Sequence, residues 1–407
     1  MRMSKRTWSA LVGATAATAF ALSAALPAAA ASTEPDLLWY DNVPGYEAIH
    51  GSGITGEGVT IAVIDGPINV EVPTLQGADV RVQESTCLDE SGRPYPMSST
   101  DFDLADHGTS VTSLLVGTGA GYPGQTGVNG VAPGATVLFY GVYIETEGGP
   151  LCHSSLLDSS LNDGVRDATA LAIERAVASG ADIISISMIT GEGRRMRAAL
   201  KEAILAGVII VAGLANAIGP DQPYDGPQAT LRGVVSVLGA QRTGELSPLI
   251  NPFSGDIIGP NDSEYVVVVA PGWEILTQGK HGDGLQQGPG YGTSLATPIV
   301  AGNLALAMQK YPQATGNQIL QSMIHNTDTG EPHEPVWEPM FGFGIVVPRT
   351  LLAADPTQYP DVNPLVKWLS PQLRFPTLEE MFPNGYPPPQ EPAAAPSSST
   401  TPTPGDS

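Results

Sequence analysis

Basic residues are scarce in this sequence. Its 407 residues include 18 Lys and Arg against 41 Asp and Glu, which gives a formal net charge of −23 at pH 7. Binding to nucleic acid through charge needs a basic surface, so this balance argues against a nucleic-acid partner. An acidic chain could attract cationic peptides or calcium, but acidity also keeps a protein soluble, and we give solubility the larger weight.

Cysteine is scarce as well. Cys87 and Cys152 are the only two, which is too few for a zinc site, and no CxxC or paired His accompanies them. In an exported protein such a pair usually forms a disulfide, so the sequence predicts a Cys87–Cys152 bond. The two lie in polar, loop-like stretches, residues 81–104 and 144–164. On the chain-entropy account a bond between them would stabilise the fold by roughly 4 kcal/mol.

Long apolar runs are absent beyond the N-terminus, so no later segment is expected to cross a bilayer. Residues 1–31 combine a charged start, an apolar stretch from Leu11 to about Leu26 and small residues that offer cleavage sites. This pattern is typical of a secretory signal peptide. It predicts a secreted protein, extracellular or associated with the cell wall.

Mostly apolar runs alternate with helical patterns between about residues 57 and 310. Runs that are apolar on both faces are typical of buried parallel strands. Helical patterns at about 165–179 and 194–206 each end before a glycine, which suits a helix C-terminus. The alternation predicts an α/β fold, a doubly wound, mostly parallel sheet with helices on both faces. The expected strands are Val59–Ile64, Val137–Tyr143, Ile183–Met188, Val208–Ala212, Val234–Leu238 and Val266–Ala270.

Three segments follow from these patterns. The predicted signal peptide covers residues 1–31, a catalytic domain with an N-terminal extension covers 32–355, and a Pro/Ser/Thr-rich tail covers 356–407. The tail composition predicts an extended or disordered spacer, and no clear cell-wall sorting signal or internal repeat is found.

One serine has the setting of a nucleophile. Ser294 lies in Gly292–Pro298, between a tight Gly-Thr turn and a run of small residues, which predicts a hydroxyl at a helix N-terminus. A hydroxyl needs a base to become a nucleophile. His107 is the candidate base, and the apolar stretch after it predicts that a helix begins there. In sheets of this kind, active sites lie beyond the carboxyl ends of the strands.

Two residues that follow expected strands complete the candidates. Asp65 ends an apolar run, where a carboxylate is costly unless it is paired, although it could equally cap a turn. Asn216 follows another run and could donate to a developing oxyanion together with the Ser294 N–H, or simply make a turn.

Together these residues resemble the subtilisin-like serine proteases, the subtilases. Asp65, His107 and Ser294 occur in the chain order of that family. The segments Gly292–Pro298, His107–Thr109, Gly130–Pro133 and Ala270–Gly272 match its G-T-S-x-A-x-P, H-G-T, G-V-A-P and A-P-G signatures. The resemblance covers roughly residues 38 to 352. No G-x-S-x-G elbow surrounds Ser294, so the α/β-hydrolase alternative fails.

The resemblance implies a subtilisin-like fold and a serine endopeptidase acting on a protein or peptide substrate. Ser294 would attack the scissile carbonyl, His107 would move the proton, Asp65 would orient the imidazole, and Asn216 would bind the oxyanion. Catalysis would need no cofactor. A structural calcium stays open because no ligand set stands out, and we expect a monomer.

The sequence also departs from the family pattern. Asp65 is followed by Gly66-Pro67 where many subtilases have a hydroxyl residue and then glycine, and Ala215 precedes Asn216 where glycine is usual. Ser187, Met188 and Ile189 lie on the edge where peptide substrates pair. Ile189 and Thr190 replace two usual glycines there, which predicts a crowded cleft and narrow specificity.

Two further expectations follow from the resemblance. Only about 20 residues separate the signal peptide from the catalytic pattern near Tyr46, too few for an independently folded pro-domain. Mycosins also lack a typical pro-domain but end in a membrane helix, so kinship to them is weaker. The alternative from another class is a catalytically silent subtilase fold that acts as a binding or scaffold protein at the cell surface.

Overall fold

The computed structural model describes residues 36–144, 151–152, 164–189, 194–216, 229–250, 256–260, 263–279, 287–328 and 331–367. The predicted signal peptide and most of the predicted tail lie outside these ranges. Within them, no helix has both the length and the apolar character needed to cross a membrane.

A seven-stranded sheet forms the centre of the fold, and every pair of adjacent strands is parallel. All the expected strands are present, with small shifts at their ends. The sheet also includes β2, a short edge strand that the sequence did not signal. In spatial order the strands are β2 (Val80–Val82), β3 (Thr136–Gly141), β1 (Thr60–Asp65), β4 (Ile183–Ile186), β5 (Ile209–Gly213), β6 (Val235–Ala240) and β9 (Val268–Pro271).

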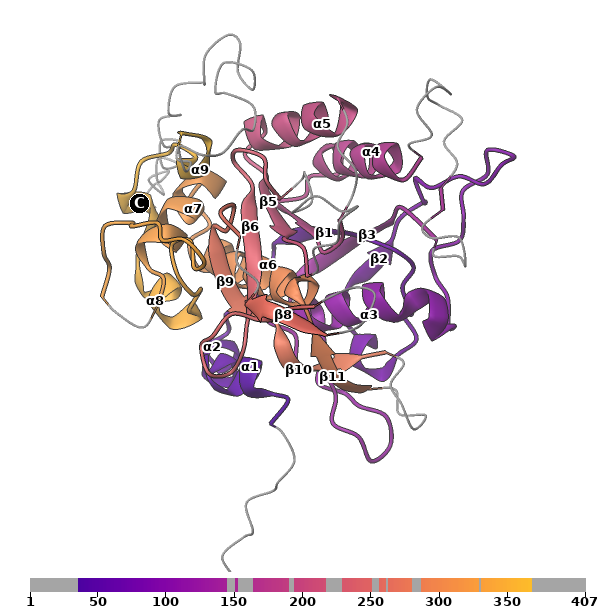
Figure 1. Cartoon of the computed structure of the whole chain (residues 1–407), viewed down its shortest axis with the longest axis horizontal. Coiled ribbons are helices and arrows are strands. Elements are labelled where there is room, and N and C mark those ends of the chain that lie inside the picture. The colour runs from indigo at the N-terminus through magenta and orange to yellow at the C-terminus, as the bar shows by residue number, and fades with distance from the viewer. Residues whose placement is uncertain are drawn as a thin grey trace, which may run out of the picture. The chain divides into compact units, whose positions relative to one another are not determined.

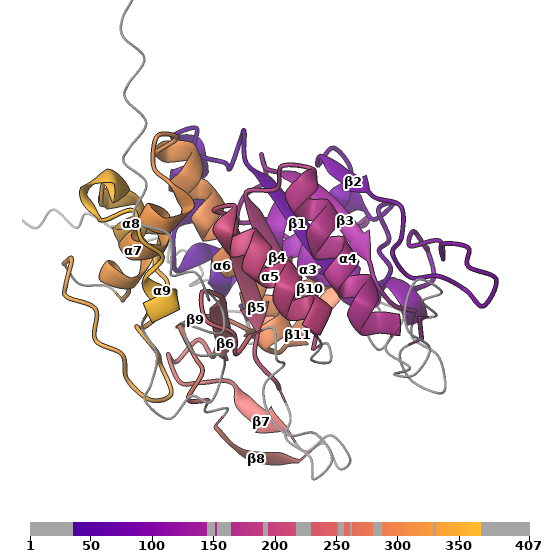
Figure 2. The same cartoon turned by 90° about the horizontal axis from the view of Figure 1, so that it is seen from above.

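Helices cover both faces of the sheet, which confirms the predicted fold class (Figures 1 and 2). Successive residues of β1 enter two separate cores: Ile61 and Val63 pack into one, Ala62 and Ile64 into the other. Strands buried on both faces therefore read as continuous apolar runs. The first core lies under α3 (Phe102–Val116) and α6 (Thr293–Lys310), and the second under α4 (Gly164–Ala178) and α5 (Arg194–Leu205).

The strand order reverses direction at β1. The chain passes from β1 to β3 on one side and later returns to β4 on the other side of β1. In open α/β sheets, the crevice beyond the carboxyl ends of the strands at such a reversal is where ligands bind. The carboxyl ends of β1 and β4 therefore mark the expected position of the site.

Shorter elements surround the sheet. Residues Leu365 and Val366 are buried in the two cores, and the Asp361 carboxylate accepts a hydrogen bond from Thr315 Oγ1 at 2.6 Å. The fold therefore continues into the stretch that composition assigned to the tail. The shorter helices around the sheet are α1 (Trp39–Asn42), α2 (Tyr46–Gly51), η1 (Pro73–Leu75), α7 (Gly316–His325), α8 (Pro348–Ala353), η3 (Pro356–Gln358) and α9 (Pro364–Lys367). Two antiparallel ribbons join them: β7 (Pro248–Ile250) pairs with β8 (Ile257–Pro260), and β10 (Trp273–Gln278) pairs with β11 (Gln287–Tyr291).

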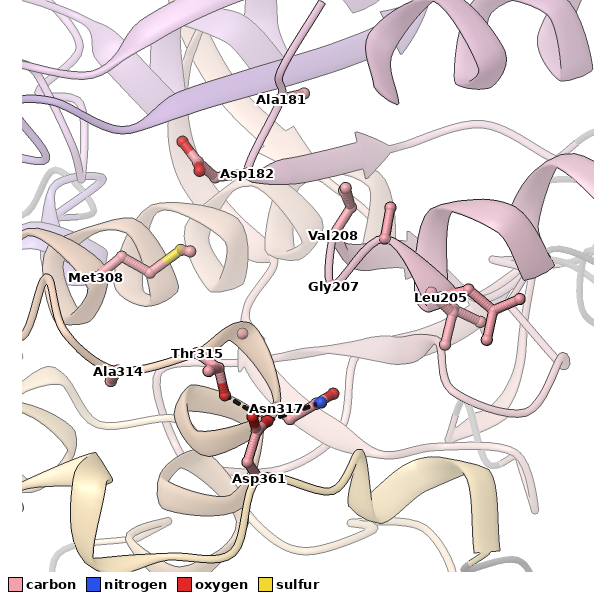
Figure 3. Close-up of a pocket in the computed structure, with 13 residues that line it drawn as sticks. Ala181, Asp182, Leu205, Gly207, Val208, Met308, Ala314, Thr315, Asn317 and Asp361 are labelled. Atoms are coloured by element: carbon pink, nitrogen blue, oxygen red, sulfur yellow. Dashed lines mark hydrogen bonds between the residues drawn. The ribbon is translucent and has the colours of Figure 1, made fainter. Parts of the chain in front are cut away.

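A pocket of about 340 Å³ lies at the amino-terminal edge of the sheet (Figure 3). Asp182 and Val208, which precede β4 and β5, line it on one side. On the other side Asp361 accepts hydrogen bonds from Thr315 and from Asn317 Nδ2, the latter at 2.9 Å. These polar groups satisfy one another, and the pocket lies at the edge opposite to the one where active sites form.

Candidate active site

Asp65 is fully buried at the carboxyl end of β1. Its Oδ1 accepts a hydrogen bond from the Gly66 N–H at 2.7 Å and lies 2.8 Å from His107 Nδ1, and its Oδ2 lies 3.0 Å from the same nitrogen. An unpaired buried carboxylate costs several kcal/mol. Of the two roles that the sequence left open, the structure shows the paired carboxylate.

His107 lies in the second turn of α3. The expectation that a helix begins at His107 is wrong, because α3 begins at Phe102. Asp101 caps it by accepting a hydrogen bond from the Asp103 N–H at 3.0 Å. The segment Phe102–Asp106 between the cap and His107 mixes three apolar residues with two aspartates, so no continuous apolar stretch marks this helix start.

The residues after His107 fix α3 against its surroundings. A Cβ atom at Gly108 would lie 2.5 Å from the Pro67 carbonyl oxygen, so glycine lets the helix approach the loop that follows Asp65. Thr109 Oγ1 accepts from the Asn69 N–H at 2.8 Å and donates to the Ala105 carbonyl. This role of Thr109 was not predicted, although its place in the H-G-T segment was the available signal.

Opposing effects set the charge state of His107, whose side chain is 39% exposed. Burial lowers its pKa, whereas the negative charge of Asp65, the hydrogen bond to Asp65 and the nearby charge of Asp106 raise it. The raising effects win, and the pKa lies above its ordinary value of 6.5. Asp65 therefore stabilises the protonated imidazole, which is the form a general base reaches when it accepts a proton.

Ser294 is the second residue of α6 and is 9% exposed. The structure thus confirms the predicted place at a helix N-terminus. The first N–H groups of a helix have no acceptor within it, so the Ser294 N–H can serve a negative charge. Thr293 joins this helix start to the end of β5, because its hydroxyl donates to the Leu214 carbonyl. Thr293 is a second residue whose structural role the sequence analysis missed.

Asn216 lies directly beside the start of α6. Its Oδ1 accepts a hydrogen bond from the Thr293 N–H at 2.7 Å. Since an N–H can only donate, this contact identifies the oxygen and leaves the Nδ2 donors directed elsewhere. Gly292 makes the approach possible: its φ is +132°, and a Cβ atom there would lie 2.9 Å from Asn216 Nδ2.

The predicted substrate-binding residues follow β4. The β1–β4 register pairs Ile64 with Ile186, so Ser187 is the residue next to Asp65 across the strand pair. Ser187 is buried, Met188 is half-buried, and the Ile189 side chain is 48% exposed. Thr190 lies outside the described residues. The bulky side chain expected at this edge is therefore open to solvent at Ile189.

The structure joins the candidate residues into two pairs, Asp65 with His107 and Asn216 with the start of the Ser294 helix. Helices α3 and α6, which carry His107 and Ser294, pack against each other on one face of the sheet. Within the described residues no hydrogen bond joins His107 to Ser294. Catalytic hydrogen bonds are often long in a free enzyme and shorten when substrate binds.

Cys87 and Cys152 are both buried thiols, so the predicted disulfide is not formed in this structure. The two are nevertheless neighbours: a hydrogen bond with Cys152, together with burial, raises the pKa of Cys87 well above its ordinary value. Across the described ranges, no group of three or more His, Cys, Asp or Glu side chains is arranged to hold a metal ion.

Comparison with known proteins places the chain in a known family. The model of the subtilase family matches residues 56–344. Subtilisin NAT from Bacillus subtilis subsp. natto is 28% identical over 273 residues, which cover 67% of this chain and 61% of subtilisin NAT. Mycosin-4 from Mycobacterium tuberculosis is 29% identical over 224 residues, covering 48% of this chain and 47% of the mycosin. The match thus spans about 61% of the length of subtilisin NAT and of subtilisin E.

Solved structures show the same fold. Fervidolysin from Fervidobacterium pennivorans superposes with a TM-score of 0.55 at 22% identity, covering 78% of this chain and 46% of fervidolysin. MycP1 from the ESX-1 type VII secretion system gives 0.56 at 21% identity, covering 80% of this chain and 88% of MycP1.

The Asp65–His107 contact predicts how His107 titrates. Replacing Asp65 by Asn removes the carboxylate charge but keeps the burial, so the pKa of His107 should fall from above 6.5 in the wild type to a lower value. Proton NMR titration of the imidazole measures it, with the His107→Ala spectrum assigning the signal. Asp106→Asn should cause a smaller fall. An unchanged pKa in Asp65→Asn would contradict the pairing.

Proposed function

The chain belongs to the subtilase family, and we propose that it is an exported serine endopeptidase that hydrolyses peptide bonds through an acyl-enzyme on Ser294. The observation that carries the proposal is the buried Asp65–His107 pair at the reversal point of the sheet. The second pair, Asn216 with the helix start of Ser294, supplies the other half of the machinery. The N-terminal sequence pattern supports export.

The reaction follows from these contacts. Because His107 Nδ1 is engaged by Asp65, its Nε2 is the nitrogen available to the Ser294 hydroxyl. As Ser294 Oγ bonds to the scissile carbonyl carbon, its proton passes to Nε2, and the imidazolium then gives that proton to the amine as the C–N bond breaks. A water molecule then attacks the acyl-enzyme ester in the same way, with His107 again moving the proton. This step releases the carboxylic acid product and restores Ser294. No cofactor is needed.

The carbonyl oxygen gains negative charge in each tetrahedral intermediate. The Asn216 Nδ2 donors and the Ser294 N–H are the groups we assign to it. Donors that are held in place before reaction cost no reorganisation at the moment charge develops. The bond from the Thr293 N–H to Asn216 Oδ1 holds the amide in this way. Ala215 is buried beside it, so the departure from glycine leaves the contact with Thr293 intact.

A silent subtilase fold that only binds partners is the second candidate. The exposed Ile189 at the substrate edge favours it, because a bulky side chain there obstructs peptide pairing. The Asp65–His107 pair argues against it, since binding alone gives no reason to bury a carboxylate against an imidazole.

A fluorophosphonate probe separates these candidates. The folded wild type should become labelled, whereas Ser294→Ala should not, and His107→Ala should label far more slowly because the base is missing. Asn216→Ala should lower kcat by about 10²–10³, the loss known for one oxyanion donor in subtilisin. Circular dichroism checks that each variant is folded. Absence of wild-type labelling, or labelling that survives in Ser294→Ala, would rule out the enzyme.

We infer narrow specificity from Ile189. Wild-type protein should digest unfolded casein slowly, and Ile189→Gly should speed digestion about tenfold or more, since relieving a steric conflict of about 1–3 kcal/mol changes a rate by that order. Ile257→Gly is the matched control, because Ile257 is an exposed isoleucine on β8. Rapid casein digestion by the wild type would count against narrow specificity.

We also infer that the neighbouring thiols Cys87 and Cys152 oxidise to a disulfide after export. Non-reducing digestion should then yield a linked peptide pair. Dithiothreitol should lower the thermal midpoint of the oxidised wild type, in line with a stabilisation of roughly 4 kcal/mol. Cys87→Ser, the control, should start at the lower midpoint and not respond to dithiothreitol. A wild-type midpoint that is insensitive to reduction would disprove the bond.

A further inference from the structure

The β10–β11 ribbon borders both helices that carry the candidate catalytic residues. At one end, Ser110 Oγ of α3 donates to the Gln278 carbonyl of β10 at 2.6 Å. At the other end, β11 stops at Tyr291, three residues before Ser294. Figure 1 shows the ribbon beside α3. The Tyr291 end of the ribbon therefore leads directly into the start of α6, which carries Ser294.

Two aromatic rings meet at that end. Trp273 and Tyr291 are direct cross-strand partners, with ring centroids 4.7 Å apart and ring planes at 70°. The Tyr291 side chain is 47% exposed, which is unusual for a large ring this close to a nucleophile. The faces of such rings carry partial negative charge and attract cations.

Glu274 adds a full negative charge at the same place. It is the extra residue of a β-bulge, because Trp273 pairs with Tyr291 and Ile275 pairs with Gly290. Its φ of +52° places a non-glycine residue in the left-handed region. Bulges of this kind redirect a side chain and are common beside active sites. The charge of Glu274 also adds to burial in raising the pKa of Tyr291, so the carboxylate acts directly on that side chain.

The bulge is held in place by the N-terminal part of the domain. The buried indole of Trp39 donates from Nε1 to the carbonyls of Trp273 at 3.2 Å and Glu274 at 3.1 Å. Two residues further on, the Leu276 N–H donates to the Leu37 carbonyl at 2.8 Å. Among the described residues Glu274 forms no ion pair, so its exposed charge is not neutralised within them.

We propose that Trp273, Glu274 and Tyr291 form a substrate subsite for one positively charged side chain, lysine or arginine, next to the scissile bond. The inference rests on the proposed endopeptidase function and names its substrate class. The carboxylate would pair with the cation while the Trp273–Tyr291 pair contacts its alkyl stem or guanidinium plane. The two interactions together select a basic residue over a neutral one of similar size.

Pools of octapeptides, each with one position fixed as Lys, Arg, Gln or Leu, test the subsite. The wild type should cleave pools with a basic residue at one position near the scissile bond about tenfold faster than the Gln pool. That ratio corresponds to about 1.4 kcal/mol of selectivity. In Glu274→Gln this ratio should fall to about threefold or less. Tyr291→Ala should lower it as well, and Tyr291→Phe should keep it because the ring face remains.

Glu47→Gln is the matched control, an exposed glutamate on α2 whose replacement should leave the ratio unchanged. Active wild-type protein without a basic preference at any position would overturn the subsite, as would a preference that Glu274→Gln retains. Direct binding of the same pools, fluorescently labelled, to Ser294→Ala separates this result from failure of the enzyme proposal. If Ser294→Ala binds the Lys pool more tightly than the Gln pool while the wild type hydrolyses neither, the subsite is supported and the protease proposal is wrong. Equal binding of the Lys and Gln pools overturns the subsite.

Discussion

The site depends on one buried carboxylate. Asp65 is removed from water at the end of β1, where, among the described residues, its contacts with His107 and the Gly66 N–H offset the loss of solvation. The sequence around His107 serves that contact. Gly108 allows α3 to approach the loop after Asp65, and Thr109 ties the helix to that loop. The H-G-T segment therefore has a packing reason for each of its residues, quite apart from proton transfer.

The sheet topology explains how residues far apart in sequence come together. Strand β3 is added to the sheet on one side of β1, whereas β4 and β5 are added on the other side. Because the strands are parallel, the carboxyl ends of β1, β4 and β5 lie at the same edge of the sheet. Asp65 ends β1, Ser187 follows β4, and Asn216 comes three residues after β5, all on this edge. Helix α6 brings Ser294 to the edge because Thr293 is bonded both to Leu214 and to Asn216. Each half of the site is thus fixed to the sheet independently, and the packing of α3 on α6 sets their relation.

Local patterns in the sequence predicted the fold well, but they were not sufficient to assign every residue of the site. Strands buried on both faces leave long apolar runs, which is why β1, β4 and β5 could be read directly. Asp65 and Asn216 could be assigned only through the family motifs, because a single polar residue after a strand has several ordinary roles. The start of α3 was missed because two aspartates interrupt the apolar residues of Phe102–Asp106. The bulge at Glu274 left no signal at all, because it arises from the register between two strands and from the indole of Trp39 on a distant helix.

These features bear on how a subtilase can become selective. Peptide pairing along a strand edge gives affinity that every sequence shares, so it cannot discriminate between substrates. If Ile189 obstructs that pairing, as we propose, the free energy for binding must come from contacts with particular side chains. A carboxylate beside two aromatic rings, held by the Trp39 hydrogen bonds before any ligand arrives, is suited to supply it, because little ordering remains to be done on binding. The net charge of −23 acts in the same direction by drawing cationic peptides toward the protein. In the proposed enzyme, Ile189 at the substrate edge and the charged ribbon that precedes Ser294 would both contribute to selecting the substrate.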